Sequence, residues 1–495
     1  MQALISLYDK TGLDSLAPAL IEAGYSLIAS GGTAKALRDL GIAHTKVEDL
    51  TGFPSLFGGR VKTLHPAIHG PILADRSLPE HVRELEDQGW SPIDIVIVNL
   101  YPFDTDPSVE LIDIGGPALV RAAAKNFASV AVVVDPSDYG WIRESLATGI
   151  TIEDRRRLAA KAFGYVSAYD ARVANWLEGD DSPLPTHQLL NLRRTRELRY
   201  GENPHQPGAF YIAEGAETGW AQAQWLGTEE PSYLNFFDAD GAQRLLERLG
   251  DRPACVIVKH GGPCGVARRD EILDAYVEAF EGDPLSAFGG VVAINRPLTP
   301  ELAQAMLERP KFDVLVVPSV VAEAEQIILG KRRRSRIAVF PGAALTVGIR
   351  SVAGGYLLQP PDELETVEEF RLVTSRVPSQ AEMTDAWMAV AVGQAAASNA
   401  VTIVKNQAAV GVGQGQPSRV DASRIAVTKA GDKARGGAGA SDAFFPFPDG
   451  LEALIAAGVT TIVAPSGSVK DDEIAKVAEE AGVSLLFAPR RHFRH

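Results

Sequence analysis

Short apolar runs alternate with amphipathic stretches from residue 1 to about residue 135. The runs ALISLY, YSLIA, DIVIVNL and SVAVVV have the length and the β-branched content of buried strands. Between them, LDSLAPALIEAG, TAKALRDLG and GPALVRAAAKN repeat their apolar residues at helical spacing. Because strands that alternate with helices form parallel sheets, this pattern predicts a doubly wound α/β domain.

The alternation breaks near residue 190. A long helical stretch rich in Ala and Arg, residues 152–179, leads into the Pro-containing segment GDDSPLPTHQLL. We therefore predict one domain over 1–190 and a second over 191–495. Within the second, ADGAQRLLERLG followed by ACVIVKH recurs later as AEMTDAWMAVAVGQAAASN followed by AVTIVKN. The repeated helix-then-strand order indicates two duplicated α/β subdomains, approximately 191–360 and 361–495.

The net charge of the chain indicates which kinds of molecule it binds. The chain has 63 acidic and 48 basic residues and a net charge of −15, which disfavours nucleic acid and anionic membranes. The basic run KRRRSR at 331–336 fits a solvated loop face better than a nucleic-acid contact. No apolar run approaches the roughly 18 residues of a membrane span, and MQALISLYDK reaches Asp9 before a cleavable signal could form. We expect a cytoplasmic protein that acts on small molecules.

Cysteine content excludes two further classes of protein. Cys255 and Cys264 are the only cysteines, too few for a disulfide framework. They also lack the paired spacing of a structural zinc site. We interpret both as inert packing thiols.

Two glycine-containing segments of the first domain suit an anion. SGGT at 30–33 lies between a strand and a helix, where backbone amides and the helix amino end favour a phosphate, although a plain strand-to-helix turn uses the same residues. GGRVKTLHPAIHG at 58–70 gathers Arg60, Lys62 and Thr63 in a polar, cationic loop. His65 and His69 have no carboxylate at a fitting spacing, so we predict no metal there.

Polar residues also end the predicted strand IDIVIVNL of this domain and open the helix that follows. NLYPF at 99–103 and IDIGG at 111–115, with the helix after them, supply Asn99, Tyr101, Asp113 and Lys125. These donors and this carboxylate could stabilise an oxyanion while a proton moves. Each of the four residues taken alone is more often structural.

The stretch VIVKHGGPCG at 256–265 carries chemistry in the second domain. An apolar run ends in Lys259 and His260, and the chain then turns on Gly261 and Gly262. Ligands bind at the carboxyl ends of strands in open α/β sheets, so this pair is a candidate for catalysis. A surface Lys beside a hydrogen-bonded His at a turn would give the same pattern, and these ten residues leave both interpretations open.

Ordered motifs run essentially from end to end: ASGGTAKALRDLG, GGRVKTLHP, NLYPF, IDIGG, RAAAKN, RYGENPHQ, KH with PCG, SAFGG, GQPSRVD, SDAFFPF, PSGS and RHFRH. Together they resemble the bifunctional purine biosynthesis family, which joins inosine monophosphate (IMP) cyclohydrolase to a formyltransferase. The resemblance implies a methylglyoxal-synthase-like doubly wound first domain, two zinc-free cytidine-deaminase-like subdomains and a homodimer.

The resemblance also implies two successive reactions. The 5-amine of aminoimidazole carboxamide ribonucleotide (AICAR) attacks the formyl group of the co-substrate 10-formyltetrahydrofolate, which gives formylated AICAR (FAICAR). The carboxamide nitrogen of FAICAR then attacks the new formyl group, and loss of water gives IMP. Neither step requires a metal.

Site residues follow by the same resemblance. For formyl transfer, His260 would act as the base, Lys259 would stabilise the oxyanion or protonate the leaving folate nitrogen, and Asn399 would hold the geometry. Ring closure would use Lys62, Tyr101, Asp113 and Lys125, and the folate side would use Phe444, Asp449 and Ser468. The residues implied as nucleotide contacts are Ser6, Lys10, Ser30, Gly31, Gly32, Thr33, Arg60, Lys62, Thr63, Asn99, Asp113, Arg199, Tyr200, His205, Gly289, Asp313, Asn399, Arg419 and Arg491.

Three positions depart from the family pattern. Tyr8 stands where Ser is usual, Gly262 replaces the Asn of KHxNP, and Pro448 replaces a basic residue. The first bears on a phosphate contact, the second on bracing of the Lys-His pair and the third on folate affinity.

Two alternatives of other classes compete with this interpretation. A non-catalytic nucleotide- or anion-sensing module would account for the first domain but has no need of the second. A zinc deaminase sharing the carboxyl-terminal fold would need the His-x-Glu and Pro-Cys-x-x-Cys motifs, which the sequence lacks.

Overall fold

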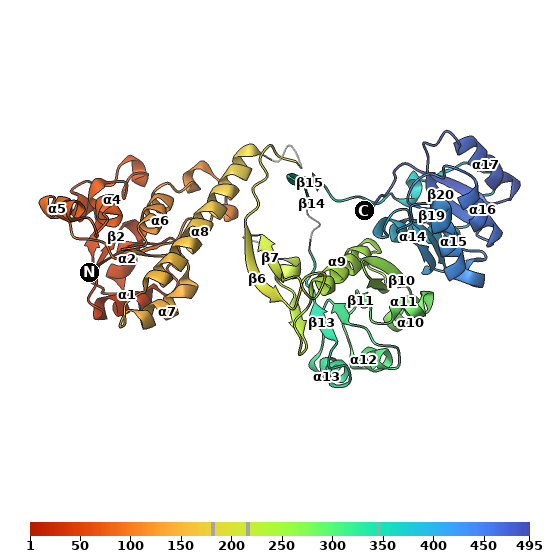
Figure 1. Cartoon of the computed structure of the whole chain (residues 1–495), viewed down its shortest axis with the longest axis horizontal. Coiled ribbons are helices and arrows are strands. Elements are labelled where there is room, and N and C mark those ends of the chain that lie inside the picture. The colour runs from red at the N-terminus through yellow and green to blue at the C-terminus, as the bar shows by residue number, and fades with distance from the viewer. Residues whose placement is uncertain (180–183, 214–217, 344–346) are drawn as a thin grey trace. The chain divides into compact units, whose positions relative to one another are not determined.

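The computed structural model describes residues 1–179, 184–213, 218–343 and 347–495. Residues 180–183, part of the segment expected to hold the domain boundary, lie outside the described residues. The chain divides into two compact units, Met1–Asn191 and Leu192–His495. Figure 1 colours the first from red to yellow-orange and the second from yellow to blue.

The first unit is built on a five-stranded sheet of order β3-β2-β1-β4-β5 in which every neighbouring pair is parallel. Its strands are β1 (Gln2–Ser6), β2 (Ser26–Ala29), β3 (Thr45–Lys46), β4 (Ile95–Val98) and β5 (Ala131–Val133). This confirms the predicted doubly wound sheet. The strand order reverses between β1 and β4, which is where an open α/β sheet leaves a crevice at its carboxyl edge.

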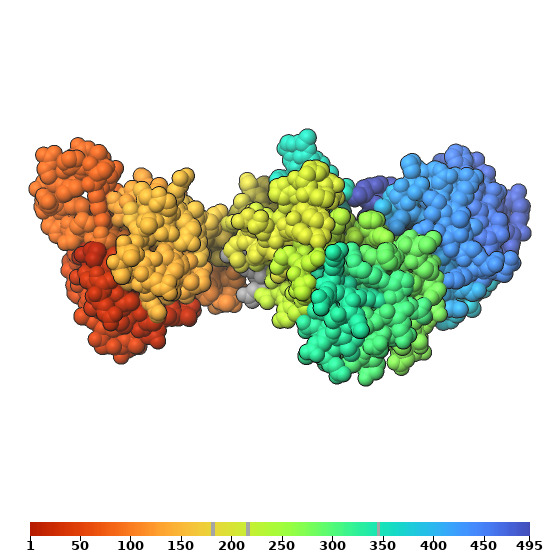
Figure 2. Space-filling view, turned by 60° about the horizontal axis from the view of Figure 1, so that its bottom comes forward, coloured from red at the N-terminus to blue at the C-terminus, as the bar shows by residue number. Residues whose placement is uncertain are grey.

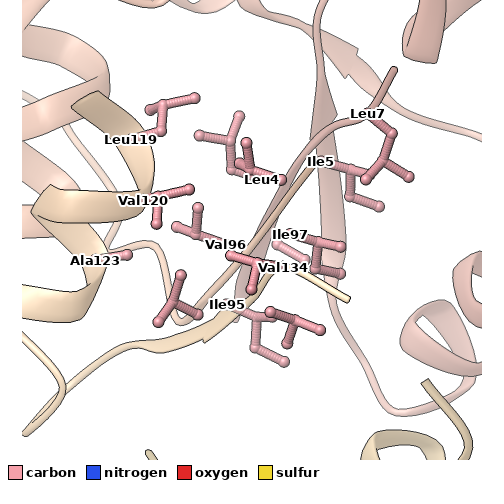
Figure 3. Packing of buried hydrophobic residues seen from close by; sticks show 14 of the residues in the cluster. Leu4, Ile5, Leu7, Ile95, Val96, Ile97, Leu119, Val120, Ala123 and Val134 are labelled. Carbon is pink, nitrogen blue, oxygen red and sulfur yellow. The ribbon is translucent and has the colours of Figure 1, made fainter. Parts of the chain in front are cut away.

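Helices of the first unit bury their apolar faces on this sheet. In Figure 3, Leu119, Val120 and Ala123 of the helix over 115–125 point toward Leu4 of β1 and Val96 of β4. All of these side chains are buried, which makes them the centre of one continuous core. The helices are α1 (Leu13–Glu22), α2 (Gly31–Asp39), α3 (Val47–Thr51), α4 (Pro66–Leu73), α5 (Pro79–Asp87), α6 (Gly115–Lys125), α7 (Tyr139–Ser145) and α8 (Ile152–Glu178), with short 3-10 turns η1 (Phe57–Gly59), η2 (Phe103–Thr105), η3 (Val109–Leu111) and η4 (Pro136–Asp138).

The second unit contains a twelve-stranded mixed sheet whose two halves repeat one topology. The first half has the order β8-β13-β12-β11-β9-β10 and the second has the order β16-β21-β20-β19-β17-β18. The halves meet where β10 and β18 pair antiparallel, with Ala267 opposite Ala408. Each half thus places its strands in the same spatial order, as expected of a duplicated subdomain.

The strands of the first half are β8 (Gln224–Leu226), β9 (Ala254–Lys259), β10 (Gly262–Arg268), β11 (Val291–Ile294), β12 (Val314–Val317) and β13 (Arg336–Val339). Those of the second half are β16 (Arg371–Leu372), β17 (Val401–Lys405), β18 (Ala408–Gly413), β19 (Ala438–Ser441), β20 (Thr461–Pro465) and β21 (Ser484–Ala488). Two separate hairpins are β6 (Leu192–Leu198) with β7 (Gly208–Ala213) and β14 (Gly348–Val352) with β15 (Gly355–Gln359). Most side chains of the β14–β15 hairpin are exposed, and Figure 2 shows it standing out from the surface.

Helices of this unit also occupy matching places in the two halves. The helix before β9 and the helix before β17 both begin with a capping box, formed by Ser232 with Asn235 and by Ser379 with Glu382. The helices are α9 (Tyr233–Arg248), α10 (Ile272–Gly282), α11 (Pro284–Ala287), α12 (Pro300–Leu307), α13 (Ala322–Lys331), α14 (Gln380–Ala395), α15 (Arg419–Ala430), α16 (Asp449–Ala456) and α17 (Asp471–Glu480), with 3-10 turns η5 (Gly219–Ala221), η6 (Val367–Glu369) and η7 (Gly431–Ala434).

Candidate active sites

A cavity of about 450 Å³ opens in the first unit. It lies at the carboxyl edge of the sheet, where β1 ends at Ser6 and α2 begins at Gly31. Ten of the sequence-predicted residues line it: Ser6, Ser30, Gly31, Gly32, Thr33, Arg60, Lys62, Thr63, Tyr101 and Asp113. The structure therefore brings together five separate segments of the sequence.

Positive charge gathers at the amino end of α2. No side chain caps this helix, so its first amides lack a side-chain acceptor. Lys62 Nζ lies 3.4 Å from where a Cβ on Gly31 would be, and Lys10 Nζ lies 3.5 Å from the corresponding point on Gly32. Two ammonium groups beside free helix amides form a site for an anionic group such as a phosphate.

Asp113 is the carboxylate of this cavity. Its Oδ1 accepts a 2.8 Å hydrogen bond from Gly116 N. Burial raises the pKa of Asp113, while the amides of Gly116 and Gly115 and the charge of Lys62 act in the opposite direction. Burial also raises the pKa of Tyr101, and the charge of Asp113 adds to that effect. A carboxyl group with a raised pKa beside a cation is suited to proton transfer.

Helix α8 fixes the two loops that carry these groups. Leu100 N donates to Tyr165 Oη at 2.9 Å, which holds the chain just before Tyr101. Asp113 N donates to Tyr169 Oη at 2.8 Å, and the same hydroxyl donates to Leu111 O at 2.6 Å. Two tyrosines one helical turn apart thus hold both loops, so α8 supports the site without lining it.

Three predicted residues of this domain are not among those that line the cavity: Lys10, Asn99 and Lys125. Asn99 Oδ1 accepts from Tyr8 N at 2.5 Å and from Asp9 N at 3.1 Å, and its Nδ2 donates to Asp9 O at 2.7 Å. Its side chain therefore holds the loop after β1. Lys125 is exposed at the last residue of α6.

The sequence analysis missed one charged residue of the cavity. Glu110 lines it and pairs with Arg60, which is fifty positions away along the chain. The pair sets the direction of the Arg60 guanidinium. No local motif marks a residue whose role depends on so distant a partner.

In the second unit, Lys259 is the last residue of β9 and His260 follows it directly. His260 and Gly261 form the two-residue turn between β9 and β10, because Lys259 pairs with Gly262. Both have positive φ, 54° for His260 and 77° for Gly261, as a type I′ turn requires. The His260 side chain is exposed, and Lys259 Nζ donates to Phe288 O at 2.7 Å.

Asn399 lies in a hydrogen-bonded network just before β17. Its Oδ1 accepts from Arg419 Nη2 at 2.6 Å, and its Nδ2 donates to Gln416 O at 2.9 Å. Arg419 is buried and also pairs with Asp442, which in turn accepts from Ser398 Oγ at 2.6 Å. Asn399 and Arg419 are thus joined by a direct hydrogen bond.

Strand directions relate these two groups. From β9 through β10 and β18 to β17, each neighbouring pair is antiparallel. The carboxyl end of β9 and the amino end of β17 therefore lie at one edge of the sheet. Three strand spacings separate the two strands, which is about 14 Å. Lys259 with His260 and Asn399 with Arg419 flank this edge.

The remaining predicted residues of this unit do not line a shared cavity. Arg199 pairs with Glu229 and stacks on Tyr200, Asp313 pairs with Lys311, and Arg491 stacks on Phe493. His205 is exposed, and Gly289 has a φ of 72°. Phe444 is 37% exposed, Asp449 begins α16, and Ser468 Oγ accepts from Lys470 N. None of them lines the cavity of about 400 Å³ between α9, the β14–β15 hairpin and the C-terminus.

Both cysteines are buried, and burial raises the pKa of each thiol, that of Cys264 to about 12. They are therefore protonated at neutral pH. Among the residues that the structure describes, no three His, Cys, Asp or Glu side chains form a group that could hold a metal ion. In that same part of the chain, no helix combines the length and apolarity of a membrane span.

Comparison with known proteins agrees with the fold and with the family resemblance. A model described as "AICARFT/IMPCHase bienzyme" matches residues 123–429, and one described as "MGS-like domain" matches residues 12–126. Two relatives are the bifunctional purine biosynthesis proteins PurH of Roseobacter denitrificans and Brucella ovis. Each is 42% identical to this chain, and both alignments cover the whole of this chain. They cover 98% of the Roseobacter protein and 97% of the Brucella protein. A solved chain titled "Crystal structure of ForH" is 38% identical, covers 35% of this chain and 95% of its own, and has a TM-score of 0.33.

The fold and the first cavity define an α/β enzyme that acts on an anionic small molecule. The chain belongs to the AICARFT/IMPCHase bienzyme family. It is a bifunctional enzyme of purine biosynthesis that formylates AICAR with 10-formyltetrahydrofolate and closes FAICAR to IMP. The full-length match removes the sensing module and the zinc deaminase as alternatives.

Proposed function

We propose that the two activities are divided between the two units, with ring closure in the first and formyl transfer in the second. The observation that carries the first assignment is the cavity of about 450 Å³, because ten predicted residues line it and all belong to Met1–Asn191. For the second, the support is the sheet edge that Lys259, His260 and Asn399 share.

In ring closure, the amino end of α2 with Lys10 and Arg60 binds the phosphate of FAICAR. The Asp113 carboxylate takes the proton of the carboxamide nitrogen as that nitrogen attacks the formyl carbon. Lys62 and Tyr101 donate to the oxygen that becomes negative, and water then leaves. Lys125 remains a proposal from the resemblance alone.

In formyl transfer, His260 takes a proton from the 5-amine of AICAR as the amine attacks the formyl carbon of the folate. This proton transfer is needed because delocalisation into the ring makes the amine a weak nucleophile. Lys259 stabilises the oxyanion or protonates the folate nitrogen that leaves, and Asn399 holds the substrate.

The other predicted residues of the second unit bind the two substrates. Phe444, Asp449 and Ser468 contact the folate, because an aromatic face and a carboxylate suit a pterin ring. The nucleotide contacts are Arg199, Tyr200, His205, Gly289, Asp313, Arg419 and Arg491. We also propose a homodimer that acts in the cytoplasm, as the resemblance implies. Light scattering should then give a mass near twice 52.8 kDa.

Two substitutions test this division. Lys62→Ala should lower IMP formation from supplied FAICAR by about 10²-fold or more, comparable to the loss of one oxyanion donor. His260→Ala should lower release of tetrahydrofolate by about 10² to 10⁴-fold, the usual contribution of a positioned base. Each variant should keep the other activity. Loss of both activities in either variant would contradict the division.

The duplicated half supplies matched controls. Lys405 ends β17 as Lys259 ends β9, and its Nζ donates to Arg435 O at the same 2.7 Å. Asn406 follows it with a φ of 51°, close to the 54° of His260. Lys405→Ala and Asn406→Ala remove equivalent side chains from the other turn, so formyl transfer should stay within about threefold of the wild-type rate, the context-dependent scatter of single-site effects away from the chemistry.

A further inference from the structure

The turn that presents His260 is held from outside by a carboxylate. Asp238 on α9 accepts two backbone hydrogen bonds, from His260 N to Oδ2 at 3.1 Å and from Gly261 N to Oδ1 at 2.7 Å. Asp238 is 8% exposed, so water does not compete freely for these contacts. Both amides of the turn thus have the same acceptor.

This support matters because the turn conformation is unfavourable for His260. A φ of 54° places His260 in the left-handed region, where the Cβ of any residue other than glycine carries a steric penalty. Gly261 adopts its φ of 77° without that penalty. The direction of the His260 side chain follows from this backbone conformation, so whatever fixes the turn also aims the imidazole.

The second half of the sheet repeats the arrangement at a turn without a histidine. Asp385 on α14 accepts from Asn406 N at 2.8 Å and from Gln407 N at 2.6 Å. Asn406 and Gln407 have φ values of 51° and 58°. The duplication therefore kept a carboxylate under both turns, while only one turn carries a group assigned to chemistry.

We propose that Asp238 is a positioning residue for formyl transfer, which holds the His260–Gly261 turn so that the imidazole faces the amine of AICAR. This rests on the proposed role of His260 as the base. Asp385 makes the same contacts for stability alone. Comparing variants of Asp238 and Asp385 therefore distinguishes an effect on the stability of a turn from an effect on catalysis.

Two isosteric substitutions test the proposal in the full-length enzyme. In Asp238→Asn and Asp385→Asn, the amide oxygen still accepts one backbone N–H but the NH₂ group opposes the other. Asp238→Asn should lower kcat for formyl transfer by about 10²-fold, the cost of misplacing a reacting group by about 1 Å. Its KM for AICAR and its ring closure should stay within about twofold of wild type, because neither depends on the aim of His260. Asp385→Asn should lower the unfolding temperature by about as much as Asp238→Asn does, but its kcat for formyl transfer should equal that of the wild type.

A double variant distinguishes positioning from general damage. Because Asp238 acts through His260, Asp238→Asn combined with His260→Ala should be no slower than His260→Ala alone. Independent penalties that multiply would overturn the proposal, as would normal transfer in Asp238→Asn or equal losses of transfer in the Asp238 and Asp385 variants. If Asp238→Asn does not fold, Asp238→Glu can replace it, because this variant keeps the negative charge. Asp238→Glu should show the same selective loss of kcat for formyl transfer, but a smaller one.

The role of His260 as the base and the role of Asp238 in positioning it can be contradicted independently. Normal transfer in His260→Ala would contradict the proposed base, whatever Asp238 does. Normal transfer in Asp238→Asn together with a slow His260→Ala would leave the base in place and overturn only the positioning role.

Discussion

Asn99 shows how one side chain can serve structure where its position suggests binding. It follows β4 near the first cavity, yet its amide group makes three hydrogen bonds to Tyr8 and Asp9. The side chain is 9% exposed, so these contacts are largely shielded from water. The loop after β1 depends on them, and Lys10 is part of that loop.

Asn99→Ala should therefore destabilise the first unit. It leaves two amides and one carbonyl of the Tyr8–Asp9 loop without their partner, which costs about 1 to 3 kcal/mol of unfolding free energy. Urea denaturation followed by circular dichroism measures the loss. Asn99→Asp keeps an acceptor for both amides and should lose less. Unchanged stability with a raised KM for FAICAR would instead make Asn99 a direct nucleotide contact.

At the scale of elements, the β9–β10 hairpin accommodates the departure at Gly262. A Cβ on Gly262 would lie 2.6 Å from Cδ of Gln414, whose Nε2 donates to Pro263 O at 3.3 Å. Gln414 thus fills the space that an asparagine at position 262 would need. Gly262 begins β10 and Gln414 follows the end of the neighbouring strand β18, so the small residue and the large one fit each other.

Gly262→Asn alone should consequently lower the unfolding temperature, because the new side chain displaces Gln414 from a packed position. Adding Gln414→Ala should recover most of that loss, since it vacates the same space. Differential scanning calorimetry of the two single variants and the double variant measures the coupling. Additive losses would show that Gln414 is not what excludes a side chain at position 262.

The C-terminal segment is attached by a buried charge cluster. His492 is 3% exposed, with Nδ1 2.8 Å from Asp362 Oδ2 and Nε2 2.6 Å from Glu365 Oε2. Burial disfavours the charged imidazole, but the two carboxylates outweigh it and raise the pKa of His492 to about 9. The segment that carries Arg491 therefore depends on a protonated histidine.

A pH dependence follows with a definite sign. The pKa of His492 rises on folding from its ordinary value of about 6.5, so its contribution to stability is complete below that pH and is lost as pH rises through about 9. The unfolding temperature of the second unit should fall between these pH values, and His492→Gln should flatten the profile. His205→Gln, at an exposed histidine, should leave the slope unchanged. A wild-type profile that is level from pH 6.5 to 9 would contradict the charged cluster.

At the scale of the whole molecule, features that repeat locally were predictable and distant pairings were not. Alternating apolar runs predicted the parallel sheet of the first unit, and the recurring helix-then-strand order indicated the two halves that β10 and β18 join. Spacing could not indicate that Glu110 pairs with Arg60 or that Asp238 holds the turn at His260, because each contact forms only when distant segments pack. The motifs named the candidate side chains, and tertiary packing determines what each one touches.

The first unit carries the whole of its own core and cavity. Its buried cluster runs from Ala3 to Tyr169, and every residue that lines the cavity of about 450 Å³ belongs to Met1–Asn191. A unit with a complete core can fold alone. A fragment of residues 1–191 should therefore be folded, close supplied FAICAR to IMP at a rate within about threefold of the full chain, and release no tetrahydrofolate from formyl-folate.

The absorbance change that accompanies IMP formation measures ring closure by the fragment, and circular dichroism shows whether the fragment is folded. Lys62→Ala within the fragment is the control. It should lower ring closure by about 10²-fold or more, as we expect in the full chain, because Lys62 lines this cavity. A folded but inactive fragment beside an active full chain would mean that the second unit completes the first site. In that case the cavity would bind FAICAR, but the groups that move its protons would come from both units.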